Sequence, residues 1–251
     1  MEPDLADPLA ADIADAILAV DWSPQLPPGV HDLVGREVAA AMTQYKAIGI
    51  ATNPPGGLTL RGAGREGQIV PGRLRFAAGF TGQHRRHFER SREFLLKHWG
   101  PVLSAVRRAG VEPTMVGVVL NLKASTRDTE ADAHAFTKRL VVGYEDLDLA
   151  EAEVRFCYSK DKRYLTNITV GTYFDEVAVA PAGGGQELVT TTVDYGLVIK
   201  LDANTKYLRV FDPTANAPPV ASSVLSELLG WIDDAYRRAL PVILARGGNG
   251  D

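Results

Sequence analysis

The sequence of 251 residues is 45% hydrophobic and 23% charged, with a formal net charge of -4, and these values are typical of a folded globular protein. The charge excludes the strongly basic surface that sequence-independent nucleic-acid binding requires. No segment approaches the run of about 20 apolar residues that spans a membrane, and the one cysteine, Cys157, excludes an intramolecular disulfide.

The composition also favours a location for the protein. A single cysteine is typical of a reducing compartment, and Glu2, Asp4 and Asp7 stand where a secretory signal would carry positive charge. Arginine outnumbers lysine, and alanine and glycine are abundant, which is typical of a bacterial gene rich in G and C. We therefore expect a bacterial protein that stays in the cytoplasm.

The first apolar residues recur at about every fourth position, which predicts a short amphipathic helix. They are Leu5, Leu9, Ile13, Ile17 and Val20. Three prolines between residues 24 and 28 then stop the helix and form a stiff connector. We predict a helix and linker over residues 1–28 and an α+β domain over residues 29–251, with a sub-boundary near 110–114 as an alternative division. Two interpretations stay open: the helix packs on its own domain, or Leu9, Ile13 and Ile17 contact a partner subunit.

A second helix and three short strands are predicted next, at residues 31–46, 48–52, 58–61 and 73–78. Between two of these strands, the stretch RGAGREG has the spacing G-x-G-x-x-G of a dinucleotide-binding loop. In that fold the third glycine opens a helix, but here Pro71 and Gly72 follow and prevent one. The glycine-rich stretch therefore predicts a hairpin loop.

The strongest helical pattern covers residues 81–110, with a bend or break expected at Gly100 and Pro101. Its polar residues give two candidate binding sites. The first is the histidines His84, His87 and His98, but the last two are separated by about 16 Å of helix, too far for one metal ion. The second is Arg85 and Arg86, which suit an anion or an acidic partner, although i,i+4 pairing with glutamates is the simpler explanation.

The second half of the chain predicts a sheet with one apolar face. Strands are expected at residues 114–123 and, after a helix at 129–142, at residues 154–158, 163–180 and 189–202, with turns at SKDK and PAGGG. The last strand places Val193, Leu197 and Ile199 on one face and polar residues on the other.

An apolar face of this kind needs a cover, and the helical periodicity of residues 220–240 supplies one. The expected fold is therefore α+β, an antiparallel β-meander packed against long helices in two layers. Its element order is similar to that of helix-grip ligand binders.

Three functions are compatible with this pattern, and the sequence singles out no catalytic residue, metal ligand or cofactor. The first is a non-enzymatic binding protein of the adaptor, chaperone-like or immunity type, with another protein or a second copy as partner. The second is a carrier or sensor that holds a small apolar ligand between the sheet and the last helix, with Tyr158, Tyr195 and Trp231 as polar tips. The third is a hydrolase or nucleotide-linked enzyme that uses the helix from His84 to His98.

Overall fold

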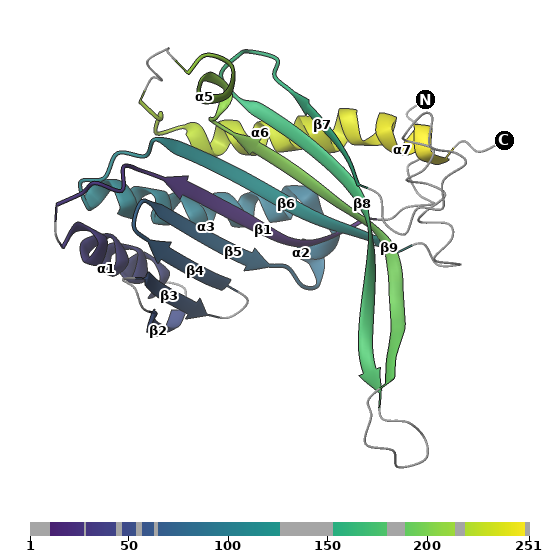
Figure 1. Cartoon of the computed structure of the whole chain (residues 1–251), viewed down its shortest axis with the longest axis horizontal. Helices are drawn as coiled ribbons and strands as arrows, with labels where there is room; N and C mark the ends of the chain where they lie inside the picture. Colours follow the sequence, from purple (N-terminus) through teal and green to yellow (C-terminus); the bar gives the residue numbers. More distant parts are fainter. Residues whose placement is uncertain are drawn as a thin grey trace.

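The computed structural model describes residues 11–27, 29–43, 47–53, 57–62, 65–125, 153–179, 189–213 and 219–248. These residues form one sheet in the strand order β2-β3-β4-β5-β1-β6-β9-β8-β7, in which every neighbouring pair is antiparallel. Helices α3, α6 and α7 lie on one side of the sheet, behind it in Figure 1. The predicted α+β class, with an antiparallel sheet packed against helices, is confirmed.

The bounds of the elements are as follows. The strands are β1 (Asp12–Asp21), β2 (Ala47–Asn53), β3 (Gly57–Gly62), β4 (Arg65–Val70), β5 (Arg73–Gly79), β6 (Met115–Ser125), β7 (Glu153–Tyr158), β8 (Leu165–Val179) and β9 (Val189–Asn204). The helices are α1 (Val30–Thr43), α2 (Gln83–Arg86), α3 (Phe88–Arg108), α5 (Tyr207–Phe211), α6 (Val224–Asp234), the π-helical turn η1 (Ala235–Ala239) and α7 (Leu240–Gly248). The helix predicted at residues 129–142 lies outside the described residues.

Strand β1 occupies the centre of the sheet, where we predicted part of a separate helix. It pairs with β5 on one side and with β6 on the other. A register shift between Ile13 and Asp15 adds a residue to the strand, so that Ile13, Ala16 and Leu18 are all buried. Apolar spacing in a bulged strand can therefore imitate that of a helix. The predicted helix is wrong for Asp12–Asp21, and Leu9 lies outside the described residues.

The two isoleucines of the predicted partner contact do not share a face. Ile13 is 1% exposed and belongs to the hydrophobic core. Ile17 is half-buried and is the register partner of Val119 on the opposite face of the sheet. Because the backbone of β1 is bonded to a strand on each side, this segment cannot detach as an arm without breaking the sheet.

A layer of helices covers one face of the sheet. Helix α6 packs on β6 and β9, and α3 contacts α1, α6 and β1. The alternation predicted for the last strand is confirmed where its side chains are described, because Leu197 and Ile199 are fully buried and Lys200 is exposed. The facing residues of α6 are fully buried as well: Leu228, Leu229 and Ile232. Helix α6 therefore packs its apolar side directly against the strands.

The long helix differs from its prediction in where it breaks. The chain leaves the helical conformation at His87, which has the extended backbone angles φ -130° and ψ 107°, and α3 then continues through Gly100 and Pro101. Proline in a helix interior removes one hydrogen bond and costs about 3 kcal/mol. Trp99 and Val102 beside it are almost completely buried, and burying side chains of this size contributes a comparable stabilisation.

A hairpin forms at the glycine-rich stretch, since Gly62 and Arg65 are register partners, but its connection is shorter than predicted because residues 61–62 and 65–67 belong to β3 and β4. Strand β4 was not predicted. Its Gly67 is the register partner of Phe76, and a Cβ atom at Gly67 would lie 3.0 Å from Cδ2 of that ring. This glycine therefore accommodates a core aromatic side chain, and no helix follows it to bind a phosphate.

The placement of β1 can be tested with two substitutions on neighbouring residues. Leu18 is fully buried under the helices, so Leu18→Ala should lower the free energy of unfolding by about 2 to 5 kcal/mol. Ile17 is only half-buried, so Ile17→Ala should cost clearly less, about 1 kcal/mol. Urea unfolding followed by circular dichroism measures both. A helix with Ile17 on its apolar stripe would give the opposite order.

Candidate functional site

Strands β8 and β9 continue beyond the rest of the sheet as a two-stranded arm. The last described pair of β6 with β9 is Ser125 with Gly196, and the last described pair of β7 with β8 is Glu153 with Gly171. Beyond these points, six register pairs, from Phe174 with Tyr195 to Val179 with Val189, join only β8 to β9 within the described residues. We call residues 174–179 and 189–195 the arm.

The arm projects away from the helices and the sheet, toward the bottom of Figure 1. At about 3.3 Å per residue its strands extend roughly 20 Å from the body. An isolated two-stranded ribbon has hydrogen-bonding groups on both outer edges. Of the elements described here, this is the one that offers such edges away from the body.

The two edges of the arm are not equivalent. Asp175 pairs with Asp194 and the next residue, Glu176, pairs with Thr192, so Val193 is an extra residue in β9. A bulge of this kind bends its strand and interrupts the row of outward backbone groups. The edge of β8 has no extra residue over the same stretch. The β8 edge is therefore the more regular template for another strand.

Two of the three residues predicted to line a ligand pocket lie at the junction of β7 with α6. Lys160 forms an ion pair with Asp234, and its Nζ lies 5.6 Å from the centre of the Trp231 ring. Burial, followed by the charge of Asp234, raises the pKa of Tyr158, whose hydroxyl is buried without a hydrogen-bond partner. The third residue, Tyr195, belongs to β9 in the arm, and its side chain lies outside the description.

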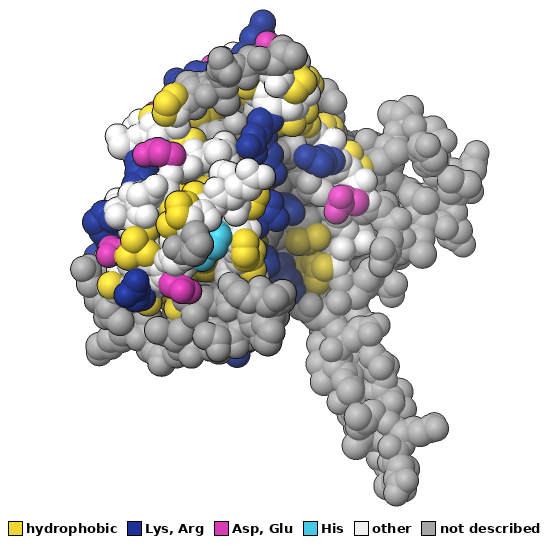
Figure 2. All heavy atoms as spheres, turned by 60° about the vertical axis from the view of Figure 1, so that its left-hand side comes forward, with side chains coloured by type: hydrophobic (Ala, Val, Ile, Leu, Met, Phe, Trp, Pro, Cys, Tyr) yellow, Lys and Arg dark blue, Asp and Glu magenta, His cyan; other side chains and the backbone are white. Residues whose placement is uncertain are grey.

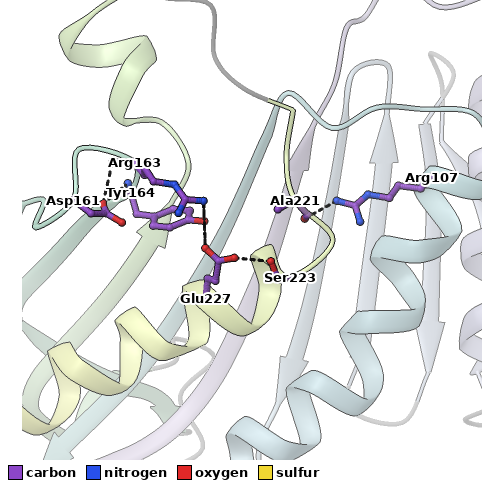
Figure 3. Close-up of polar contacts among 7 residues, drawn as sticks. All are labelled: Arg107, Asp161, Arg163, Tyr164, Ala221, Ser223 and Glu227. Atoms are coloured by element: carbon purple, nitrogen blue, oxygen red, sulfur yellow. Dashed lines mark hydrogen bonds and ion pairs between the residues drawn. The ribbon is translucent and has the colours of Figure 1, made fainter.

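The N-terminal end of α6 is held by a polar cluster centred on Glu227 (Figure 3). Its carboxylate accepts hydrogen bonds from the hydroxyls of Tyr164 and Ser223. A guanidinium nitrogen of Arg163 lies 3.5 Å from Oε2 of the same carboxylate. Burial and the bond to Glu227 raise the pKa of Tyr164 to about 12, and the bonds from Ser223 and Tyr164 lower the pKa of Glu227. The contacts fasten the turn before β8 to α6.

A second contact in Figure 3 fastens the start of α6 to α3. Arg107 of α3 donates from one guanidinium nitrogen to the carbonyl oxygens of Val220 and Ala221, at 2.8 Å each. Each charged donor of this kind contributes about 1.5 to 3 kcal/mol when its acceptor is shielded from water. Arg107, Arg163 and Glu227 therefore make this part of the molecule a structural junction between α3, α6 and the turn before β8.

The histidines of the predicted site fall into different surroundings. The rings of His84 and His98 both pack on Phe94, at centroid distances of 5.2 Å and 4.1 Å. Burial, and then the charges of Arg65 and Lys97, lower the pKa of His98 to about 4. His87 is exposed at the break between α2 and α3. The structure thus places two imidazoles around a shared aromatic ring and the third in solvent.

The two arginines of the same segment are exposed. Arg85 forms an ion pair with Asp12 of β1, with 3.0 Å between Nε and Oδ2, rather than with Glu89. Glu89 forms an ion pair with Arg237 of η1 instead. These ion pairs link α2 and α3 to other elements, and the described residues include no group of three or more histidine, cysteine or acidic residues that could hold a metal ion.

Comparisons with known proteins do not assign this chain to a family. No protein-family model and no curated protein matches it. One solved structure, described as crystal form I of TP0453, aligns with 90% of this chain and 99% of its own, at 11% identity and a TM-score of 0.16. A TM-score of this size says nothing about fold or function. In the described part of the chain, no helix has the length and apolar character needed to cross a membrane.

The junction can be tested with its two tyrosines, which differ in one respect. Tyr164 donates a hydrogen bond to Glu227, whereas the buried hydroxyl of Tyr158 has no hydrogen-bond partner. Tyr164→Phe should therefore lower the free energy of unfolding by about 1 to 2 kcal/mol, and Tyr158→Phe should leave it unchanged or raise it slightly. Equal losses in chemical denaturation would show that the bond to Glu227 contributes nothing.

The depressed pKa of His98 predicts a loss of stability in acid. In the unfolded chain a histidine takes up a proton near pH 6.5, but in the folded protein His98 stays neutral down to about pH 4. The neutral His98 therefore contributes fully to the free energy of unfolding above pH 6.5. This contribution is lost as the pH falls toward 4, and the free energy of unfolding then decreases by up to about 1.4 kcal/mol per pH unit. Replacement by phenylalanine should flatten the pH dependence of the melting temperature in this window. Above pH 8 the difference between the two proteins should be constant.

Proposed function

We propose that this chain is a non-enzymatic binding protein that acts through protein-protein contacts made by the arm. The supporting observation is the projecting strand pair itself, since residues 174–179 and 189–195 pair only with one another among the described residues. A free strand edge binds an extended segment of another protein through main-chain hydrogen bonds. The rest of the sheet and its helices hold the base of the arm in place.

A second exposed feature supports an interaction protein. Helix α5 contains no buried residue, and its Val210 and Phe211 are 56% and 60% exposed. It follows the end of β9 opposite the arm, so the two features lie at opposite ends of one strand. Exposed apolar side chains that lie next to one another are typical of contact surfaces. Helix α5 therefore serves as the alternative contact in the experiment.

The experiment shortens the arm without touching the core. Tyr173 and Gly196 are register partners, so residues 174–195 can be replaced by an Asn-Gly turn, which suits a two-residue hairpin. The proteins that copurify with the intact chain are identified and purified, and their dissociation constants are measured by calorimetry. Shortening the arm should abolish binding while the melting temperature changes by only a few degrees.

The matched control is the double variant Val210→Ser and Phe211→Ser on α5, which should bind as the intact chain does. If the control loses binding and the shortened arm keeps it, α5 is the contact and the arm is not. A partner that binds both variants with unchanged affinity contradicts both surfaces.

The two other candidate functions, a small-molecule carrier and an enzyme, predict different results for the same purified protein. A carrier would copurify with a small apolar molecule, which native mass spectrometry detects. An enzyme would lose turnover on replacement of His84 or His87 by alanine. Neither proposal has a supporting contact in the described structure comparable to the arm.

A further inference from the structure

The segment 172–196, which contains the arm, carries the whole formal charge surplus of the chain. Residues 172–196 include Asp175, Glu176, Glu187 and Asp194, and they include no lysine, arginine or histidine. The net charge of the chain is -4, so the remaining residues are balanced between acidic and basic. Figure 2 shows basic and acidic side chains together on one face of the body. The acidic surplus therefore belongs to this segment, and Asp175, Glu176 and Asp194 place three of its four charges in the arm.

The register of the two strands brings acidic residues of the arm next to one another. Asp175 and Asp194 occupy the same rung of the strand pair, next to Glu176. Like charges directly opposite one another destabilise an antiparallel pair. A cationic group beside this rung would relieve the repulsion, because opposite charges across strands are favourable.

The free backbone groups determine the form of the partner. Within the described residues, β8 has no neighbour on its outer side beyond Gly171, where its pairing with β7 ends. Every second residue of an edge strand directs its N–H and C=O outward, so residues 172–179 offer a row of donors and acceptors to one more strand. The bulge at Val193 makes the β9 edge less suitable.

We propose that the β8 edge over residues 172–179 binds an extended strand of a partner protein that is rich in lysine and arginine. This inference rests on the proposed function and specifies the partner. A second arm is a poor occupant because it carries the same charge, and nucleic acid is repelled by it. The added strand continues the line of β7, and its alternate basic residues lie on the face of the ribbon that the Asp175 and Asp194 positions share.

The test uses synthetic peptides and the whole chain. The probe is a nine-residue peptide in which lysine alternates with valine and threonine, and the matched peptide has glutamate in place of lysine. Fluorescence anisotropy should show binding of the lysine peptide to the intact chain and no binding to the chain with the shortened arm. Methylation of the backbone nitrogens along one edge of the lysine peptide should abolish binding, and methylation along the other edge should not.

Charge is tested separately. The triple variant Asp175→Asn, Glu176→Gln and Asp194→Asn should bind the lysine peptide about tenfold more weakly at low salt, and the difference should disappear at high salt. The control variant, Asp32→Asn with Glu112→Gln, removes two exposed charges away from the arm and should bind normally. Equal binding of the glutamate peptide, or binding retained after shortening the arm, would overturn the proposal.

Two further outcomes separate this proposal from the proposed function. A purified natural partner could bind only when the arm is present, yet with the same affinity for the triple variant and at every salt concentration. The proposed protein-binding function would then be supported, and the proposal of a basic strand as partner would be contradicted. If light scattering shows a dimer that the triple variant dissociates, the occupant is a second copy of this chain. That result would also overturn the assignment of a separate basic partner.

Discussion

The insertion of β1 between β5 and β6 is the constraint on which the rest of the structure depends. Strands β2 to β5 follow one another in the chain and in the sheet, and β6 to β9 form a second group. Strand β1 joins the two groups by pairing with a member of each. One continuous apolar face results, and α3 and α6 contact each other over it. Burial of this face supplies the main driving force for folding.

Within the described residues the neighbouring strands differ in length, and the arm is the part of the two longest that extends beyond the others. Strands β8 and β9 are 15 and 16 residues long, but their outer neighbours, β7 and β6, are 6 and 11 residues long. The other end of β8 is anchored, because Tyr164 and Arg163 before it contact Glu227 of α6. A strand pair that is fixed at its base, and whose described outer residues pair only with one another, can offer its backbone to another chain without disturbing the core.

Part of the candidate site was accessible from sequence and part was not. The long strands at residues 163–180 and 189–202 were predicted, as was a shorter strand at residues 154–158, and comparing these lengths could have indicated an overhang. The bulge at Val193 could not be predicted, because it depends on which residues of β8 and β9 pair. The contacts of Arg85 with Asp12 and of Glu89 with Arg237 join residues that are distant in the chain. No local pattern specifies such pairs, and i,i+4 spacing suggested another partner.

The sequence by itself determined the α+β class, the buried side of β9, the hairpin at RGAGREG and the covering helix, because these follow from the alternation of apolar residues and from turn-forming residues nearby in the chain. Only the tertiary structure decided that Ile13 and Ile17 lie in a central strand. A bulged strand and a helix can share the same apolar spacing, and the choice between them is made by backbone partners that are distant in the chain, such as Arg73 for Asp21 and Leu122 for Ile13. The same holds for the arm, because the described strands that pair with β8 and β9 come from distant parts of the chain and only the fold decides how far along them they extend.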